Sequence, residues 1–66
     1  MNKKLFKEHQ DANKDSNVRL AKVLGIDRHT LGLKLDGKNQ FKIDEVAVIA
    51  ERYKLTADDV YKIFFT

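Results

Sequence analysis

The sequence predicts an all-α domain built from five short helices, and three observations lead to this prediction. Apolar residues recur at intervals of three and four, the spacing that lines one side of a helix. Capping residues precede these segments, and all three glycines fall between residues 25 and 37, with no proline anywhere. The strand-like alternation of Leu31, Leu33 and Leu35 would have no pairing partner, and a lone strand is not stable.

The first predicted helix spans residues 3–12 and the second spans residues 17–24. Ser16 is a good N-cap for the second helix, and Gly25 stands where a left-handed residue commonly ends one. The inward side chains are expected to be Leu5, Phe6 and a half-buried His9 in the first helix, and Leu20, Ala21 and Leu24 in the second.

The third predicted helix runs from Arg28 to about Leu35, with Asp27 as its N-cap. At 100° per residue, Leu31 and Leu35 share the buried side, whereas Leu33 lies nearly opposite them and faces outward. A polar turn, DGKNQ, follows this helix.

The fourth predicted helix spans residues 43–53, and the fifth follows Thr56, with Asp59 completing a capping box. Each helix carries an apolar stripe that we expect to face the core. The stripes are Ile43, Val46, Ala47, Ala50 and Tyr53, widened by Ile49, and Ala57, Val60, Tyr61 and Phe64, flanked by Ile63 and Phe65.

Composition favours a single domain over residues 1–66 that binds no cofactor and no metal. There is no cysteine, so disulfides and thiolate metal sites are excluded, and the spacing of His9 and His29 matches no zinc pattern. No phosphate-binding loop and no nucleophile paired with a base is present, so we expect neither an enzyme nor a small-molecule substrate.

Charge is distributed unevenly along the chain. Residues 1–42 carry a balance of +5 and residues 43–66 a balance of −2, which fits either a polyanion-binding face or ordinary scatter. No apolar run is long enough for a membrane span, and the basic N-terminus lacks the apolar region of a signal peptide. We therefore expect a cytoplasmic protein of a bacterial or phage-infected cell, at its nucleoid and away from membranes.

The second and third helices have the requirements of a helix-turn-helix motif at about residues 17–35. Ala21 is small enough for a close crossing, Gly25 makes the turn, and Leu31 anchors the second helix of the motif in the core. In such motifs the second helix presents its N-terminal and outward residues to base edges in the major groove.

Candidate DNA contacts follow from this geometry. The base contacts are expected to be Arg28, His29, Gly32 and Leu33, and the phosphate contacts Asn17, Thr30, Lys34, Lys38, Asn39 and Gln40. Gly32 costs about 1 kcal/mol in a helix interior, which close approach to DNA would offset. Two alternatives stay open: Arg28 and His29 as ordinary solvated surface, and Leu33 as a protein contact.

The segments LAKVLGIDRHTL, LDGK, F-x-I-D-E-V-x-x-I-A and ERYKLTADDVYKIFF resemble small phage-type regulators of the Cro/repressor (XRE) helix-turn-helix family over residues 16–65. The resemblance implies a five-helix, lambda-repressor-like DNA-binding domain that acts as a dimer on palindromic operators. This chain departs from the family at five positions. Asn17 stands where Gln is usual, Asp27 where Ser or Thr is usual, and Lys42 where a Ser or Thr cap is usual. Gly32 and Leu33 stand where polar residues more often read bases.

The leading hypothesis is a sequence-specific transcriptional regulator, a Cro-like repressor or phage switch protein, that binds double-stranded operator DNA as a homodimer. Phe64 and Phe65 are candidate dimer contacts because two aromatic residues on a terminal helix rarely both fit inside. The alternative is a helix-turn-helix protein-interaction module, an antirepressor or assembly factor, that does not bind DNA. A third reading is a domain of a longer repressor, against which the initial methionine and the compact ending speak.

Overall fold

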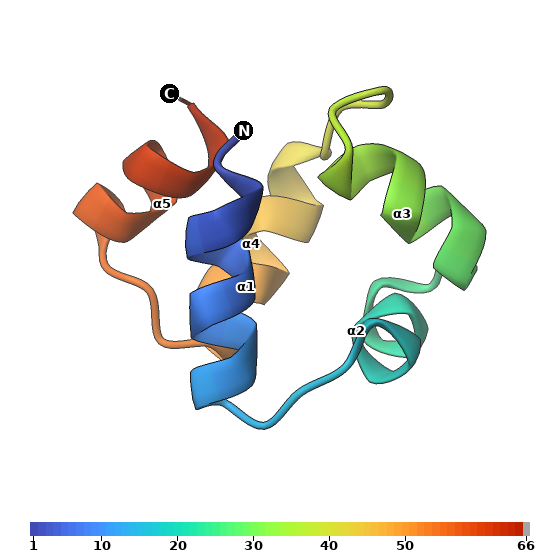
Figure 1. Cartoon of the computed structure of the whole chain (residues 1–66), viewed down its shortest axis with the longest axis horizontal. Helices are drawn as coiled ribbons and strands as arrows, with labels where there is room; N and C mark the ends of the chain where they lie inside the picture. The colour runs from blue at the N-terminus through green and yellow to red at the C-terminus, as the bar shows by residue number, and fades with distance from the viewer. Residues whose placement is uncertain (66) are drawn as a thin grey trace.

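Five helices form the protein, as the computed structural model shows for residues 1–65, the part of the chain that it describes. In order they are α1 (Lys3–Ala12), α2 (Asn17–Leu24), α3 (Arg28–Leu35), α4 (Ile43–Arg52) and α5 (Ala57–Phe64) (Figure 1). No strand occurs among these residues. The all-α, five-helix prediction is therefore confirmed, and the fourth helix ends one residue earlier than expected, with Tyr53 as its C-cap.

Local side-chain chemistry explains where the helices begin. Ser16 Oγ accepts a hydrogen bond from the Arg19 N–H at 3.2 Å, and Thr56 Oγ1 accepts one from the Asp59 N–H at 3.1 Å. Each bond satisfies a backbone donor that the first turn of a helix leaves without a partner. Gly25 ends α2 with φ 72°, a left-handed conformation that glycine adopts without steric cost.

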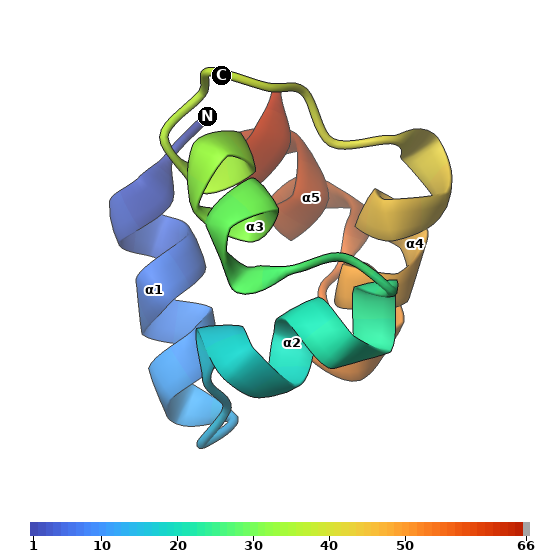
Figure 2. The same cartoon turned by 90° about the vertical axis from the view of Figure 1, so that its right-hand side faces the viewer.

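The core lies where all five helices meet, and Figure 2 shows α2 and α3 on one face, with α1 and α4 on either side of them. Phe6 packs against Tyr53 with ring centroids 5.9 Å apart, which joins α1 to the end of α4. The fully enclosed apolar side chains are Phe6, Leu20, Ala21, Leu31, Leu35, Ile49, Tyr53 and Ile63, with Leu5, Leu24, Ile26, Phe41, Leu55 and Phe64 packed around them.

The predicted inward stripe of α4 is wrong for most of its members. Ile49 and Tyr53 are buried, but Ile43 is 88% exposed, Ala47 is exposed, and Val46 and Ala50 are only half-buried. Glu45 takes the inward position one turn before Ile49, so the helix is rotated relative to the apolar stripe.

The predicted stripe of α5 needs the same correction. Ile63, expected at the flank, is its fully buried residue, whereas Tyr61 is 59% exposed and Ala57 lies on the surface. Phe64 packs edge-on against Phe41 with centroids 5.4 Å apart, and Phe65 is 64% exposed.

An open apolar groove results from the rotation of α4, and we refer to it as the α4–α5 groove. It has a volume of about 750 Å³, and its lining includes Phe41, Ile43, Val46, Ala47, Ala50, Val60, Phe64 and Phe65. The charged residue in this lining is Lys34, whose ammonium group is paired with a carboxylate.

The two ends of the described part of the chain lie close together (Figure 1). The backbone N–H of Asn2 donates a hydrogen bond to the carbonyl oxygen of Ile63 at 2.6 Å, which joins the start of α1 to the end of α5. Within residues 1–65, no helix has the length and apolar content that crossing a membrane requires.

Candidate nucleic-acid interface

The close packing of α2 against α3 depends on the residues that the sequence singles out. Ala21 is 3% exposed and Leu31 is fully buried, and both belong to the same buried cluster of the core. In the turn, the Ile26 N–H donates to the Ala21 carbonyl oxygen at 3.0 Å, and Gly25 supplies the left-handed residue. The two helices therefore form a rigid helix-turn-helix that fixes the direction of α3.

The first turn of α3 presents two basic side chains to solvent. Asp27 caps the helix by accepting a hydrogen bond from the Thr30 N–H at 2.6 Å, and this bond, more than any other effect, lowers the pKa of the Asp27 carboxyl below its usual value. Arg28 and His29 are exposed, and neither side chain makes a hydrogen bond to another described residue. Their donors are therefore available to an external ligand.

Gly32 and Leu33 are both half-buried, so Leu33 is more enclosed than a side chain that points straight outward. A Cβ added at Gly32 would meet no atom within 4 Å. Internal packing thus does not require glycine at this position. The carbonyl oxygen of Leu33 accepts the N–H groups of Lys38 and Asn39, at 3.0 and 3.3 Å, which shapes the turn after α3.

Lys34 lies inside the protein, although the sequence predicts a phosphate contact for it. The residue is 6% exposed, and its Nζ lies 2.7 Å from Glu45 Oε1 and 3.3 Å from the Gln40 carbonyl oxygen. The ammonium group also lies 5.8 Å from the centroid of the Phe41 ring. A phosphate could reach this charge only after the pair with Glu45 had broken, so we leave Lys34 out of the candidate interface.

Glu45 joins the end of α3 to the start of α4, a role that sequence reasoning missed. Burial raises the pKa of the Glu45 carboxyl, but hydrogen bonds from Lys34 and from the Lys42 N–H, with the charges of both lysines, outweigh burial and lower it. The bond from the Lys42 N–H measures 2.8 Å. The sign that could have revealed this role is the position of Glu45 one turn before Ile49, on the inward face.

The remaining predicted contacts on this side surround α3. Lys38, Asn39 and Gln40 are exposed in the turn that follows the helix, where Gly37 has φ 79°. Thr30 is half-buried, beside its cap. Asn39 and Gln40 also line the α4–α5 groove, whereas Lys38 is not among its lining residues.

Asn17 lies at the start of α2 and is exposed, but its side chain is not free to rotate. Its Oδ1 accepts a hydrogen bond at 2.9 Å from Nε2 of Gln10, a residue of α1 that is only 2% exposed. Sequence reasoning missed Gln10, although it lies one turn after Phe6 on the inward face of α1. With Oδ1 occupied, the amide nitrogen of Asn17 is the atom left to donate.

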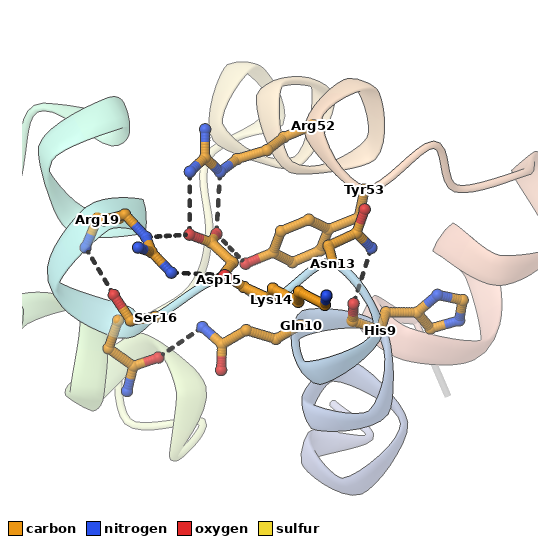
Figure 3. Close-up of polar contacts among 10 residues, drawn as sticks. His9, Gln10, Asn13, Lys14, Asp15, Ser16, Arg19, Arg52 and Tyr53 are labelled. Carbon is orange, nitrogen blue, oxygen red and sulfur yellow. Dashed lines mark hydrogen bonds and ion pairs between the residues drawn. The ribbon is translucent and has the colours of Figure 1, made fainter.

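A buried carboxylate holds the start of α2 against the end of α4 (Figure 3). Asp15 accepts two hydrogen bonds from Arg52, both at 2.9 Å, and one from the Tyr53 hydroxyl at 2.6 Å. Arg19 approaches the same carboxylate, with Nε 3.4 Å from Oδ1. The side chain of Asp15 is 3% exposed, so these partners replace the water that it loses on folding.

Ionisation of these groups is shifted accordingly. The hydrogen bonds from Arg52 hold the pKa of the Asp15 carboxyl far below its usual range, and Tyr53 contributes in the same direction. Burial, together with the neighbouring Asp15, raises the pKa of the Tyr53 hydroxyl well above its usual value. Across the neutral pH range, Asp15 is therefore an ionised carboxylate and Tyr53 a neutral phenol. Their contact fixes the helix-turn-helix on α4.

Comparison with known proteins gives one match. A family model described as "BetR domain" matches residues 2–63, nearly the whole chain and all but the last residue of α5. No curated protein and no solved structure matches. The resemblance to Cro/repressor regulators therefore stays a prediction.

Proposed function

The chain belongs to the BetR domain family, and from this premise we propose that it is a transcriptional regulator that binds double-stranded DNA through α3. The observation that carries the proposal is the exposed first turn of α3, where the side chains of Arg28 and His29 have no hydrogen-bonded partner among residues 1–65. A helix presented in this way by a helix-turn-helix fits the major groove of B-DNA.

Base reading is proposed for the residues on the outer side of α3. Arg28 can donate two hydrogen bonds to guanine O6 and N7, and His29 can donate to a purine acceptor. A Cβ at Gly32 would meet no atom within 4 Å, and glycine at this open position allows the helix backbone to approach the bases. The exposed part of Leu33 is suited to a thymine methyl group.

Phosphate contacts are proposed for the rims of the same face. Lys38, Asn39 and Gln40 lie on one side of α3, in the turn after it, and Asn17 lies at the start of α2. Such contacts position a protein on the duplex without reading its sequence. Thr30 has its backbone N–H bound to Asp27, so its hydroxyl is the group proposed for this role.

A homodimer is proposed to form through the α4–α5 groove. Ile43 and Phe65 project at its rim, 88% and 64% exposed, and each can enter the groove of a second copy in a two-fold arrangement. α4 lies beside α3 in Figure 2, and we propose an arrangement in which both α3 helices face the same duplex. Two half-sites about 34 Å apart then read successive major grooves.

The biological role that the Cro/repressor resemblance supports is that of a repressor or phage genetic-switch protein, acting on DNA in the cytoplasm and carrying out no catalysis. The second candidate function is a protein-interaction module. The exposed apolar rim of the α4–α5 groove favours it, because such a surface can bind a different partner as well as a second copy.

Fluorescence anisotropy with a library of labelled genomic duplexes tests the proposal. The wild-type protein should bind duplex DNA with an affinity that falls steeply as salt rises, since neutralised phosphates release counterions. Arg28→Glu with Lys38→Glu should abolish this binding. Lys54→Glu with Lys62→Glu, the same charge change at the end of α4 and in α5, should leave most of it.

Absence of salt-dependent binding to any duplex would overturn the DNA-binding proposal. Partner binding that survives the charge reversal at Arg28 and Lys38, in a protein that never bound DNA, would establish the interaction module instead.

A further inference from the structure

A second groove lies between α1 and the helix-turn-helix, and we refer to it as the α1–α2 groove. It has a volume of about 460 Å³ and is enclosed by α1, the start of α2 and the end of α3. Its lining residues are Lys3, Lys4, Phe6, Lys7, Gln10, Asn17 and Leu35. Figure 2 shows α1 flanking α2 and α3, so this groove borders the proposed DNA-binding face.

Three lysines of α1 line this groove, and none of them forms a buried ion pair within residues 1–65. Lys4 is exposed and makes no ion pair or hydrogen bond among residues 1–65. Lys7 lies 3.2 Å from Asp11 and Lys3 lies 2.6 Å from Asp36, but every one of these side chains is about half exposed or more. Exposed pairs of this kind contribute little and exchange readily for another anion.

Between the lysines the groove is apolar, and at its α2 end it is polar, with a side-chain amide held in place by a hydrogen bond. Phe6 and Leu35 are core residues that reach its floor. Gln10, buried beneath, occupies Oδ1 of Asn17 and leaves the amide nitrogen of Asn17 to donate. Cations at the rim, an apolar floor and one oriented donor match a sugar–phosphate chain, in which charged phosphates alternate with sugars that also present C–H groups.

We propose that the α1–α2 groove holds the backbone of the duplex whose major groove receives α3, with Lys4 and Lys7 neutralising phosphates and Gln10 holding Asn17 to donate to one. The inference rests on the proposed function, because it extends the contact with the same DNA onto α1. Gln10 is a positioning residue here, since it acts through Asn17 and does not touch the DNA.

The dependence of affinity on salt tests the role of the two lysines. Each phosphate that a cation neutralises contributes about −0.9 to the slope of log K against log salt, so Lys4→Gln with Lys7→Gln should reduce the steepness by about 1.8. At about 0.1 M salt the affinity should fall on the order of 10-fold for each lysine. The matched control, Lys54→Gln with Lys62→Gln, changes the net charge equally and should leave the slope near that of the wild type.

Failure of this inference and failure of the proposed function give different results. If the wild type binds duplex DNA and Arg28→Gln weakens binding, but the Lys4 and Lys7 variant keeps the wild-type slope, α3 binds DNA and the α1–α2 groove does not. If the wild type binds no duplex, both proposals are overturned.

A double-mutant cycle tests the role of Gln10. Gln10→Met keeps the volume of the side chain and removes the hydrogen bond to Asn17. It should weaken DNA binding in the wild-type background and have no further effect when Asn17→Ala is already present. An equal loss in both backgrounds, measured well below the unfolding temperature of each variant, would show a general structural role and overturn the positioning role.

Discussion

Replacing Gly32 by alanine should stabilise the protein and, at the same time, weaken its binding to DNA. Gly32 lies in the interior of α3, where glycine is less favourable than alanine by about 1 kcal/mol because its backbone loses more freedom on folding. An added Cβ meets no atom within 4 Å, so no clash offsets this gain. For a domain of this size, about 1 kcal/mol corresponds to a rise in melting temperature of about 4–8 °C.

Gly25→Ala is the matched control for this substitution. An added Cβ there also meets nothing within 4 Å, but the residue has φ 72°. A left-handed backbone costs a residue with a side chain about 1–2 kcal/mol, so the same chemical change should lower the melting temperature. Thermal unfolding followed by circular dichroism measures both variants.

DNA binding is measured on the same two variants. If the backbone of α3 approaches the bases at Gly32, the methyl group of Gly32→Ala should reduce affinity for duplex DNA although the fold is more stable. A melting temperature that stays unchanged or falls for Gly32→Ala would refute the reasoning from open space and helix propensity. Unchanged affinity would refute the close approach alone.

Three further predictions concern stability and assembly. Asp15→Asn should lower the free energy of unfolding by about 2–4 kcal/mol in urea titrations, because it weakens a buried, charge-assisted network, whereas Asp11→Asn, at an exposed pair, should change it by less than about 0.5 kcal/mol. The pKa of Asp15 is depressed in the folded state, so its contribution to the free energy of unfolding is complete above the unfolded value of 3.8 and declines as pH falls below it. Urea midpoints should therefore drop between pH 4 and pH 2, and they should drop less in Asp15→Asn. Ile43→Asp should abolish self-association in sedimentation experiments without loss of stability, because the side chain is exposed at the N-terminus of α4, whereas Ile49→Ala should cost about 2–5 kcal/mol. A protein that is monomeric before the change at Ile43, or one in which Asp15→Asn unfolds at the wild-type urea concentration, would contradict these expectations.

Helix boundaries were predictable from the sequence because local chemistry determines them. Ser16, Asp27 and Thr56 each accept a hydrogen bond from the backbone three residues later, and Gly25 has the left-handed conformation expected of it. These interactions depend on neighbours in the chain, which a single sequence displays directly.

The faces of α4 and α5 were not predictable in the same way. An apolar stripe shows that a helix has an apolar side, but it does not say what covers that side. In α4 the pairing of Glu45 with Lys34, eleven residues away, turns the charged residue inward and leaves Ile43 in solvent. The same applies to Asp15 and Arg52, whose contact spans 37 residues and leaves no mark in local periodicity.

The candidate site was predictable to the extent that it depends on α2 and α3 alone. Arg28, His29 and Lys38 are exposed as expected, since their positions follow from helical geometry. The sequence predicts a phosphate contact for Lys34, and only its pairing with Glu45 shows that the side chain is buried. The α1–α2 groove depends on how α1 packs, which no spacing within α2 and α3 encodes.

The bond between Asn2 and Ile63 also bears on chain topology. Because the start of α1 lies beside the end of α5, a short linker between these two points would close the backbone into a ring without moving a helix. Closing a loop of this length removes about 4 kcal/mol of entropy from the unfolded chain on the loop-closure model. A protein without cysteine has no disulfide to provide this restraint, so head-to-tail cyclisation is the covalent route to greater stability that its own geometry offers.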